Sequence, residues 1–427
     1  MWLRWATCVA MAIAPCVYAQ DDRSRLDVLT LDAALERVGR VHPDLRLSDA
    51  RRPLLEAGID AASQRPPLTA GATLENFAGN GPYAGAGRAE LTVTLAGVLE
   101  RGGKLEARRA VAMAQLDALA PQREVLRLDL LAETARRYLD VTAAQRQRDI
   151  ALEDIAQRKR AVDAAQRRLS AGASPESALM TAQAALAQAQ LDRDRAYQAE
   201  EVARLRLAAL WNGREGQFRT AAGDPLALPA LEDFRQLAEW LERTPELAAL
   251  AGQARVREAE LRLAQSARQP DLQWQAGLRG LNGDDALALT GGFSLPLGSA
   301  SRAAPGIRAA EAGLRLGDAE RDAMRSRLYV LLASAHGQYT TARLEAARLG
   351  TDVLPRLARA ELAADRAWRA GAISYLEWSQ LQAMRVEARK RQLDVAVQAQ
   401  QALIEIQRLT GQPLVAPGLA SLPETAP

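Results

Sequence analysis

Cysteine is nearly absent from this chain of 427 residues, because the only two, Cys8 and Cys16, lie within its first nineteen positions. Residues 1–19 have the pattern of a secretory signal peptide, with a basic start, an apolar stretch and the small-x-small ending Val17-Tyr18-Ala19. We therefore expect an exported mature chain without cysteine, which excludes disulfides and thiolate metal sites. Lipidation of Cys16 is the alternative, although the proline before it fits a lipoprotein signal poorly.

Histidine is equally scarce, and we interpret the two widely separated residues, His42 and His336, as structural. A strong transition-metal site would then need carboxylates or methionines, so we expect neither a metal site nor another cofactor. The stretch 97-GVLERGGKL-105 approaches a phosphate-binding loop, but Leu105 stands where serine or threonine is required. Since no nucleophile and base are placed together elsewhere, we do not expect an enzyme.

The chain also lacks an excess of one charge and a long apolar run. Its 55 Lys and Arg nearly balance its 52 Asp and Glu, and the two signs are interspersed. This composition argues against a nucleic-acid partner. After the signal segment no stretch holds eighteen uncharged apolar residues, so no helix of the mature chain is expected to span a bilayer.

The sequence does contain an internal duplication. The phrase 42-HPDLRLSDARRPLLEAGIDAASQRPPL-68 returns as 244-TPELAALAGQARVREAELRLAQSARQPDL-272, and 167-RRLSAGAS-174 returns as 368-WRAGAIS-374. The glycines of the latter pair, Gly172 and Gly371, lie 199 residues apart. We infer one duplicated unit, with a first repeat at 20–213, a linker at 214–243, a second repeat at 244–411 and a tail at 412–427.

Each repeat is expected to hold a helix, two strands and a long helical hairpin. The first contains a helix over 31–65, broken near His42-Pro43, then strands 68–77 and 89–98 and a hairpin over 104–211. The second contains strands 271–279 and 286–295 and a hairpin over 303–410. Ser174-Pro175-Glu176 predicts the start of a helix, with a cap residue, a proline and an acid in the first turn.

The first helix of each predicted hairpin is too long for an ordinary globular protein, since about 66 residues span roughly 100 Å. Apolar residues recur along them at heptad-like spacing, as in the series Ile155, Val162, Leu169 and the series Leu131, Tyr138, Leu152. Such spacing favours helices wound around partner helices. An isolated coiled-coil scaffold, soluble in the periplasm, would explain the helices but would leave the strands without a purpose.

The strands alternate between apolar and polar residues. In 89–98 one face holds Leu91, Val93 and Leu95, and in 286–295 it holds Leu287, Leu289, Phe293 and Leu295. Strands about ten residues long with this alternation are typical of outer-membrane barrels, and the loops 78–88 and 279–286 are rich in Gly, Asn and Asp. The alternative is an antiparallel sheet packed on helices in a soluble exported domain.

Four strands are too few to close a barrel, and open edges are not tolerated in lipid. The chain must therefore share its barrel with identical copies, two copies giving eight strands and three giving twelve. The fold class expected is mainly α with a transmembrane β portion, its long helices continuing the ring below the membrane as a tube.

The order of elements resembles the TolC-like outer-membrane efflux proteins. The phrase 75-ENFAGNGPYAGAGRAELTVTLAGVLERGGKLEARRAVA-112 is similar in particular to the CzcC/CusC-type branch. The resemblance implies a homotrimer with a twelve-stranded barrel in outer-membrane lipid and a periplasmic α-helical barrel. It also implies an equatorial belt, here at Gln20–Thr30, Gly213–Glu232 and Gln412–Pro427, all expected to be loop-like.

For function, the resemblance implies the outer-membrane channel of a tripartite efflux system in a Gram-negative bacterium. Its partners would be a periplasmic adaptor and an inner-membrane pump of the resistance-nodulation-division class. The usual cargo of the branch is heavy-metal cations such as cobalt, zinc, cadmium, copper or silver. Multidrug efflux and type I protein secretion use channels of the same plan and remain open alternatives.

The resemblance also implies roles for the hairpin turns, which would form the periplasmic mouth and dock the adaptor. These tip residues are Arg168, Ala171, Gly172, Ala173 and Ser174 in the first repeat and Arg369, Ala370, Gly371, Ala372 and Ser374 in the second. Glu377 stands where many relatives carry an acid that forms a cation-attracting ring at the constriction. The first-repeat equivalent is Ala178, so the nearby Glu176 could serve instead; both acids could also be ordinary solvated charges.

Overall fold

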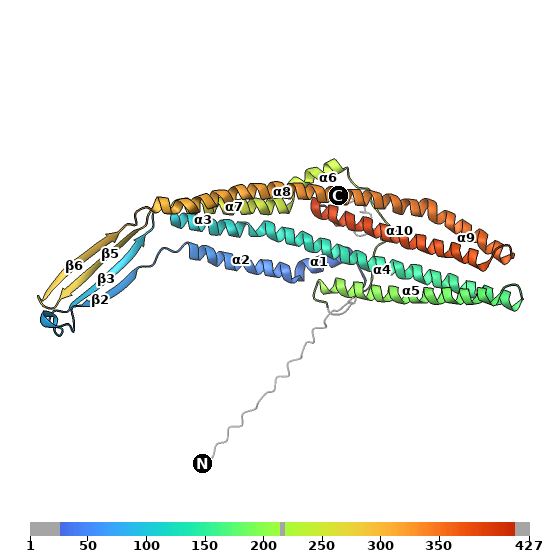
Figure 1. Ribbon diagram of the computed structural model, residues 1–427, viewed down its shortest axis with the longest axis horizontal. Helices are drawn as coiled ribbons and strands as arrows, with labels where there is room; N and C mark the ends of the chain where they lie inside the picture. Colours follow the sequence, from blue (N-terminus) through green and yellow to red (C-terminus); the bar gives the residue numbers. More distant parts are fainter. Residues whose placement is uncertain (1–25, 214–217, 415–427) are drawn as a thin grey trace, which may run out of the picture.

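The structure, a computed structural model, describes residues 26–213 and 218–414. The expected signal peptide at 1–19 and most of the tail lie outside these residues. The described chain is long and gently bent, with a β-sheet at one end and two helical hairpin tips at the other (Figure 1). None of its helices is both long enough and apolar enough to cross a membrane.

The first repeat is built mainly from helices. They are α1 (Leu31–Val41), α2 (Pro43–Ala62), α3 (Lys104–Asp117), α4 (Leu119–Ser170) and α5 (Glu176–Ala209). The break between α1 and α2 falls at His42, because Pro43 cannot continue a helix but can begin one. The His42 Nδ1 accepts a hydrogen bond from the Asp44 N–H at 3.2 Å, so this histidine caps α2.

The second repeat has the same order. Its helices are α7 (Pro245–Ser266), α8 (Ser299–Arg348), α9 (Leu354–Arg369) and α10 (Tyr375–Thr410). In each hairpin, the first long helix is not the uninterrupted helix that the sequence predicts. The first arm is divided at Ala118, and the second contains a π-helical turn at Leu349–Val353, where one extra residue is accommodated within the helix.

The four long strands form one antiparallel sheet in the order β2-β3-β5-β6. Their bounds are β2 (Thr69–Glu75), β3 (Glu90–Leu99), β5 (Leu272–Leu281) and β6 (Ala286–Ser294). Strands of both repeats meet at its centre, where Val93 lies opposite Leu278 and Thr92 opposite Arg279. The register keeps the predicted apolar face together across neighbouring strands. β2 and β6 each have one strand neighbour within the described chain.

The helices extend this order in a single curved layer. Nearer the sheet, contacts run α2-α3-α7-α8; towards the tips they run α5-α4-α10-α9 (Figure 1). The edge that holds β2 therefore continues into α2, and the edge that holds β6 continues into α8. The single chain is open along both sides.

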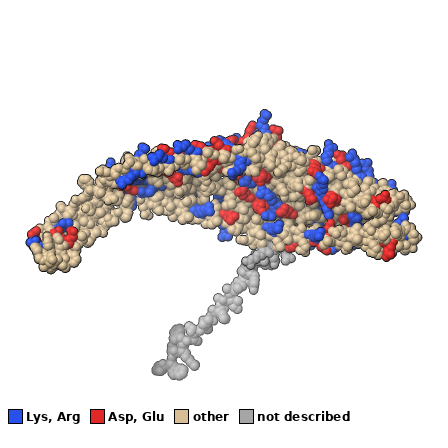
Figure 2. Space-filling model, in the orientation of Figure 1, with Lys and Arg blue, Asp and Glu red and all other residues tan. Residues whose placement is uncertain are grey.

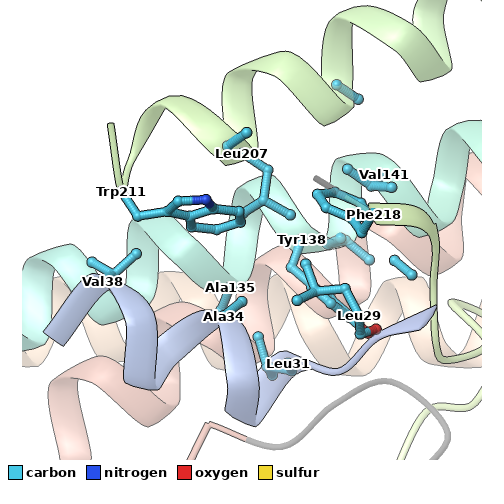
Figure 3. Packing of buried hydrophobic residues seen from close by; sticks show 14 of the residues in the cluster. Leu29, Leu31, Ala34, Val38, Ala135, Tyr138, Val141, Leu207, Trp211 and Phe218 are labelled. Atoms are coloured by element: carbon cyan, nitrogen blue, oxygen red, sulfur yellow. The ribbon is translucent and has the colours of Figure 1, made fainter. Parts of the chain in front are cut away.

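The expected belt is not entirely loop-like. Its described part contains a short parallel ladder between β1 (Leu26–Leu29) and β4 (Phe218–Ala221), and the linker adds α6 (Phe234–Trp240), which contacts α8. In the adjacent core, Leu29, Tyr138, Trp211 and Phe218 pack together (Figure 3). Backbone pairing and this apolar core explain why the segment is ordered where its composition suggested a loop.

Two equivalent tyrosines tie the belt to the hairpins. The Tyr138 hydroxyl lies 2.9 Å from the Leu29 carbonyl oxygen and 2.5 Å from that of Ala222. Tyr339, 201 residues later, donates from its hydroxyl to the Pro229 carbonyl at 2.5 Å. Both rings are fully buried. The predicted heptad position Leu152, by contrast, is 40% exposed and does not belong to a core of the single chain.

Candidate functional site

The apolar face of the sheet is exposed. Leu287, Leu289 and Phe293 on β6 are 82%, 86% and 83% exposed, and Leu91 and Val93 on β3 are about half exposed. The polar face is the more covered one, and Thr92 on it is 6% exposed. This is the reverse of a sheet in a water-soluble domain, where the apolar face packs on the core. An apolar exterior with a polar interior is the pattern of a strand sheet in lipid.

The helices at the two edges of the layer, α2 and α8, carry rows of exposed uncharged residues that pack against no other helix of the described chain. On α8, from residue 309 onward, every position of one heptad series is exposed and small or apolar: Ala309, Leu316, Ala323, Val330, Gly337 and Leu344. The positions three residues further on are all alanine, serine or threonine, and they are exposed as well. On α2 the corresponding exposed series is Leu47, Ala50, Leu54, Ala57 and Ala61. Such series favour packing against another helix.

At the opposite end of the molecule, the two hairpin turns lie side by side and enclose a groove of about 620 Å³. The groove is lined by Arg168, Ala173 and Ser174 of the first turn, and by Gly371, Ala372, Ser374 and Glu377 of the second and the helix that follows it. Gly172 and Gly371 both have positive φ angles, of 68° and 78°, so each turn uses glycine where other residues would be strained. The structure therefore brings most of the predicted tip residues together.

Arg168 joins the two tips. Its Nη1 donates to the Trp368 carbonyl at 2.9 Å and to the Arg369 carbonyl at 3.0 Å, and its Nη2 donates to the Ala173 carbonyl at 3.0 Å. The guanidinium also lies over the Trp368 ring, 5.4 Å from its centre. The sequence placed Arg168 at the tip but did not indicate this bridging role, because its partners lie about 200 residues away.

Three aromatic residues next to the second turn form the core between the tips. Trp368 and Trp378 stack at 4.4 Å between ring centres, and Tyr375 meets both edge-on. They pack against small residues of the first hairpin, including Ala178, which is 9% exposed. Ala178 is the counterpart of Glu377, and its burial explains why the first repeat carries no acid there. In a chain with 4% aromatic residues, this local cluster was a signal that our interpretation of the sequence did not use.

Glu377 closes a capping box at the start of α10. Its Oε2 accepts from the Ser374 N–H at 2.8 Å and from the Ser374 hydroxyl at 2.9 Å, while the Glu377 N–H donates back to the Ser374 Oγ at 3.2 Å. These hydrogen bonds, the backbone one first, lower the pKa of the Glu377 carboxyl. The side chain is therefore ionised at neutral pH and held in one orientation at the tip.

The first tip is built differently. We predicted Ser174 as the cap of α5, but the helix begins at Glu176 with Pro175 in the cap position and no side-chain cap. Glu176 is exposed and, within the described residues, makes no hydrogen bond or ion pair. Only the second tip thus fixes a carboxylate in place. In the described part of the chain, no three His, Cys, Asp or Glu residues gather where they could hold a metal ion.

Comparison with known proteins agrees with this arrangement. Residues 34–213 match the family model described as outer membrane efflux protein. The cobalt-zinc-cadmium resistance protein CzcC of Cupriavidus metallidurans is 29% identical over 318 residues, which cover 74% of this chain and 75% of CzcC. Protein CyaE of Bordetella pertussis is 28% identical over 370 residues, covering 85% of this chain and 74% of CyaE.

The fold is that of solved outer-membrane channels. A crystal structure of CusC, described together with its transmembrane channel formation, superposes with a TM-score of 0.75 at 17% sequence identity. The match covers 91% of this chain and 94% of that one. The resemblance inferred from the sequence is confirmed, and so is the mainly helical fold with a small strand portion. The chain is thus similar, over residues 34–213 in sequence and over most of its length in fold, to outer-membrane efflux channels of Gram-negative bacteria that extend into the periplasm and are not enzymes.

Proposed function

We propose that three copies of this chain close into a continuous tube, a twelve-stranded barrel above a helical barrel. The observation that carries this proposal is that both sides of the molecule are open in the same way. The side with β2 and α2 and the side with β6 and α8 each combine an unpaired strand edge with an exposed, uncharged heptad series.

The two open sides are different surfaces, so the open side of one copy can pair with the opposite open side of the next. Joining β6 and α8 of one copy to β2 and α2 of the next is a head-to-tail contact, which closes into a ring when the rotation is suitable. Closure pairs the strand edges that lipid does not tolerate, and it gives the α8 series a helix to pack against. Three copies supply twelve strands, an even number within the range of outer-membrane barrels.

We further propose that the tube is the passive outlet of a tripartite efflux system. A periplasmic adaptor would dock on the two joined hairpin tips, and an inner-membrane pump of the resistance-nodulation-division class would supply the energy. The groove between the tips supports the docking role, because residues of both turns line it and small residues leave it accessible.

At the tube's inner mouth, we propose Glu377 as the gate residue. Three copies would bring three ionised carboxylates near the axis, where they would attract cations. The capping box allows a sharp test, since glutamine is accepted at the same capping position. E377Q should keep the tip intact but weaken cation preference, whereas S374A should loosen the tip and keep the charge. Unchanged cation preference in E377Q channels would refute the gate.

The proposed cargo is heavy-metal cations, which the similarity to CzcC supports. The alternatives of drug efflux and protein secretion predict different phenotypes in one experiment. A deletion strain should lose resistance to zinc, cobalt, cadmium, copper or silver and regain it with the wild-type gene. Sensitivity to antibiotics alone, or a failure to export a protein, would overturn the metal assignment. A scaffold soluble in the periplasm would fail to sediment with outer membrane.

A further inference from the structure

The strands of the sheet carry charge at a single place. Among all residues of β2, β3, β5 and β6, only Glu75, Glu90 and Arg279 are charged, and the register puts all three on the polar face. They lie at the loop end of the sheet, next to 76–88 and 282–285. Figure 2 shows charged atoms gathered at the tip of this end, while the rest of the sheet region is almost free of them.

The arrangement of these three residues calls for a physical reason. Glu75 lies directly opposite Glu90 in the β2–β3 register, and like charges in this position destabilise a strand pair. Arg279 relieves the conflict by reaching across three strands. Its Nη1 lies 3.2 Å from Glu90 Oε2 and its Nη2 lies 3.5 Å from Glu75 Oε2.

Two neutral contacts fix the bridge in place. The Arg279 Nε donates to the Thr92 hydroxyl oxygen at 3.0 Å, and the Asn76 Nδ2 donates to Glu90 Oε1 at 2.9 Å. Neutral residues at all three positions would serve the stability of the sheet, since the rest of this face is Thr, Gln, Ser, Gly and Ala with Val98 and Leu281. The two acids and one base give this bridge a net charge of −1 in each chain.

We propose that the Glu75–Arg279–Glu90 bridge sets the ion selectivity of the outer part of the channel. This inference depends on the proposed trimer, in which the polar face lines the lumen and the three bridges form one ring. The ring carries three negative charges, which favour cations over anions. Arg279 prevents the paired carboxylates from holding a divalent cation, so ions are attracted but not retained.

Selectivity measured in planar bilayers tests this role. E75Q/E90Q leaves a ring of three arginines and should turn the channel towards anions. R279Q leaves six carboxylates and should raise the cation-to-anion permeability ratio by about threefold, the effect of a few screened charges across water. Added Zn²⁺ should block the potassium current of R279Q but not that of the wild type. R279K keeps the charge and should keep the wild-type ratio.

A matched control is R235Q, which removes the same charge from α6, far from the sheet (Figure 1). It should leave the permeability ratio unchanged. If all variants conduct with the wild-type ratio, the inference is wrong while the proposed channel stands. If purified wild-type protein forms no channel at all, both fail. If R279Q does not assemble, the E75Q/E90Q variant decides, because glutamine matches glutamate in shape. A wild-type cation-to-anion permeability ratio in E75Q/E90Q would overturn the inference.

Discussion

The contact that Arg168 makes between the hairpin tips leads to a quantitative prediction for the R168A variant. The substitution removes two hydrogen bonds that Arg168 donates across the tips and one that it donates within its own turn, at 2.9 to 3.0 Å, together with the contact to the Trp368 ring at 5.4 Å. Hydrogen bonds from a charged donor contribute about 1.5–3 kcal/mol each, and a cation–π contact about 0.5–1 kcal/mol at an exposed site.

The full sum would overestimate the effect, because water satisfies the tip carbonyls when the contact opens. We therefore count the free energy of one charged hydrogen bond and of the ring contact, so R168A should destabilise the joined tips by about 3 kcal/mol. This loss is local, so it should appear as faster opening of the tips and not as global unfolding. Backbone amides of the second turn should then exchange hydrogen about 150-fold faster in R168A, since each 1.4 kcal/mol is a factor of ten.

Hydrogen exchange followed by mass spectrometry on peptides covering 366–378 measures this. The matched control is R160A on the same helix, because Arg160 is exposed and, among the described residues, has no hydrogen bond or ion pair. R168K should fall between R168A and the wild type, since lysine keeps the charge but not the forked geometry. Equal exchange in R168A and R160A would refute the bridging role.

Three further predictions test other parts of the structure. L289R places a charge on the apolar face and should cost about 2–4 kcal/mol in a bilayer, reducing the amount of assembled protein in outer membrane; T290R on the polar face should not. Y138F removes a buried hydroxyl that bonds belt carbonyls and should lower unfolding free energy by about 1–2 kcal/mol in denaturant titration; an unchanged midpoint would contradict this. The Glu377 carboxyl has a pKa below its ordinary value of 4.5, so its cap on Ser374 is complete above that pH and is lost as pH falls through the lowered pKa. Opening of the second tip, measured by backbone hydrogen exchange, should increase only in that acidic range. The E377Q variant should show no such increase, because glutamine does not titrate.

The strand sheet could be predicted well because its signal is local. Alternation within each strand assigned Leu91, Val93 and Leu95 to one face, and the register shows that face continuous with Leu278 and Leu289. Any slip by one residue would have exchanged the two faces. The same locality explains the tip glycines, whose positive φ follows from their place at the end of a helix.

Features that depend on distant partners could not be predicted. Arg168 lies in a stretch rich in arginine, and nothing near it indicates the carbonyls of Trp368 and Arg369 as its partners. The parallel pairing of β1 with β4 joins two four-residue segments almost 200 residues apart, too short to stand out from loops. The division at Ala118, by contrast, has a local signal that our interpretation of the sequence did not use, because Pro121 cannot donate to the Asp117 carbonyl four residues earlier and its ring clashes with that carbonyl.

Glu377 shows a different kind of error. Ser374 followed three residues later by Glu377 is the sequence pattern of a capping box, and it was available from the sequence. We weighed the acid only as a gate residue or a solvated charge. The structure adds the local role, and the two roles are compatible because a capped carboxylate remains ionised and exposed.

The most direct test of the central claim is the mass of the purified assembly in detergent, measured by native mass spectrometry. A chain open along both sides should be found as three copies of the mature polypeptide, visible in electron micrographs as a hollow cylinder. A stable single chain with its two sides uncovered would contradict the account.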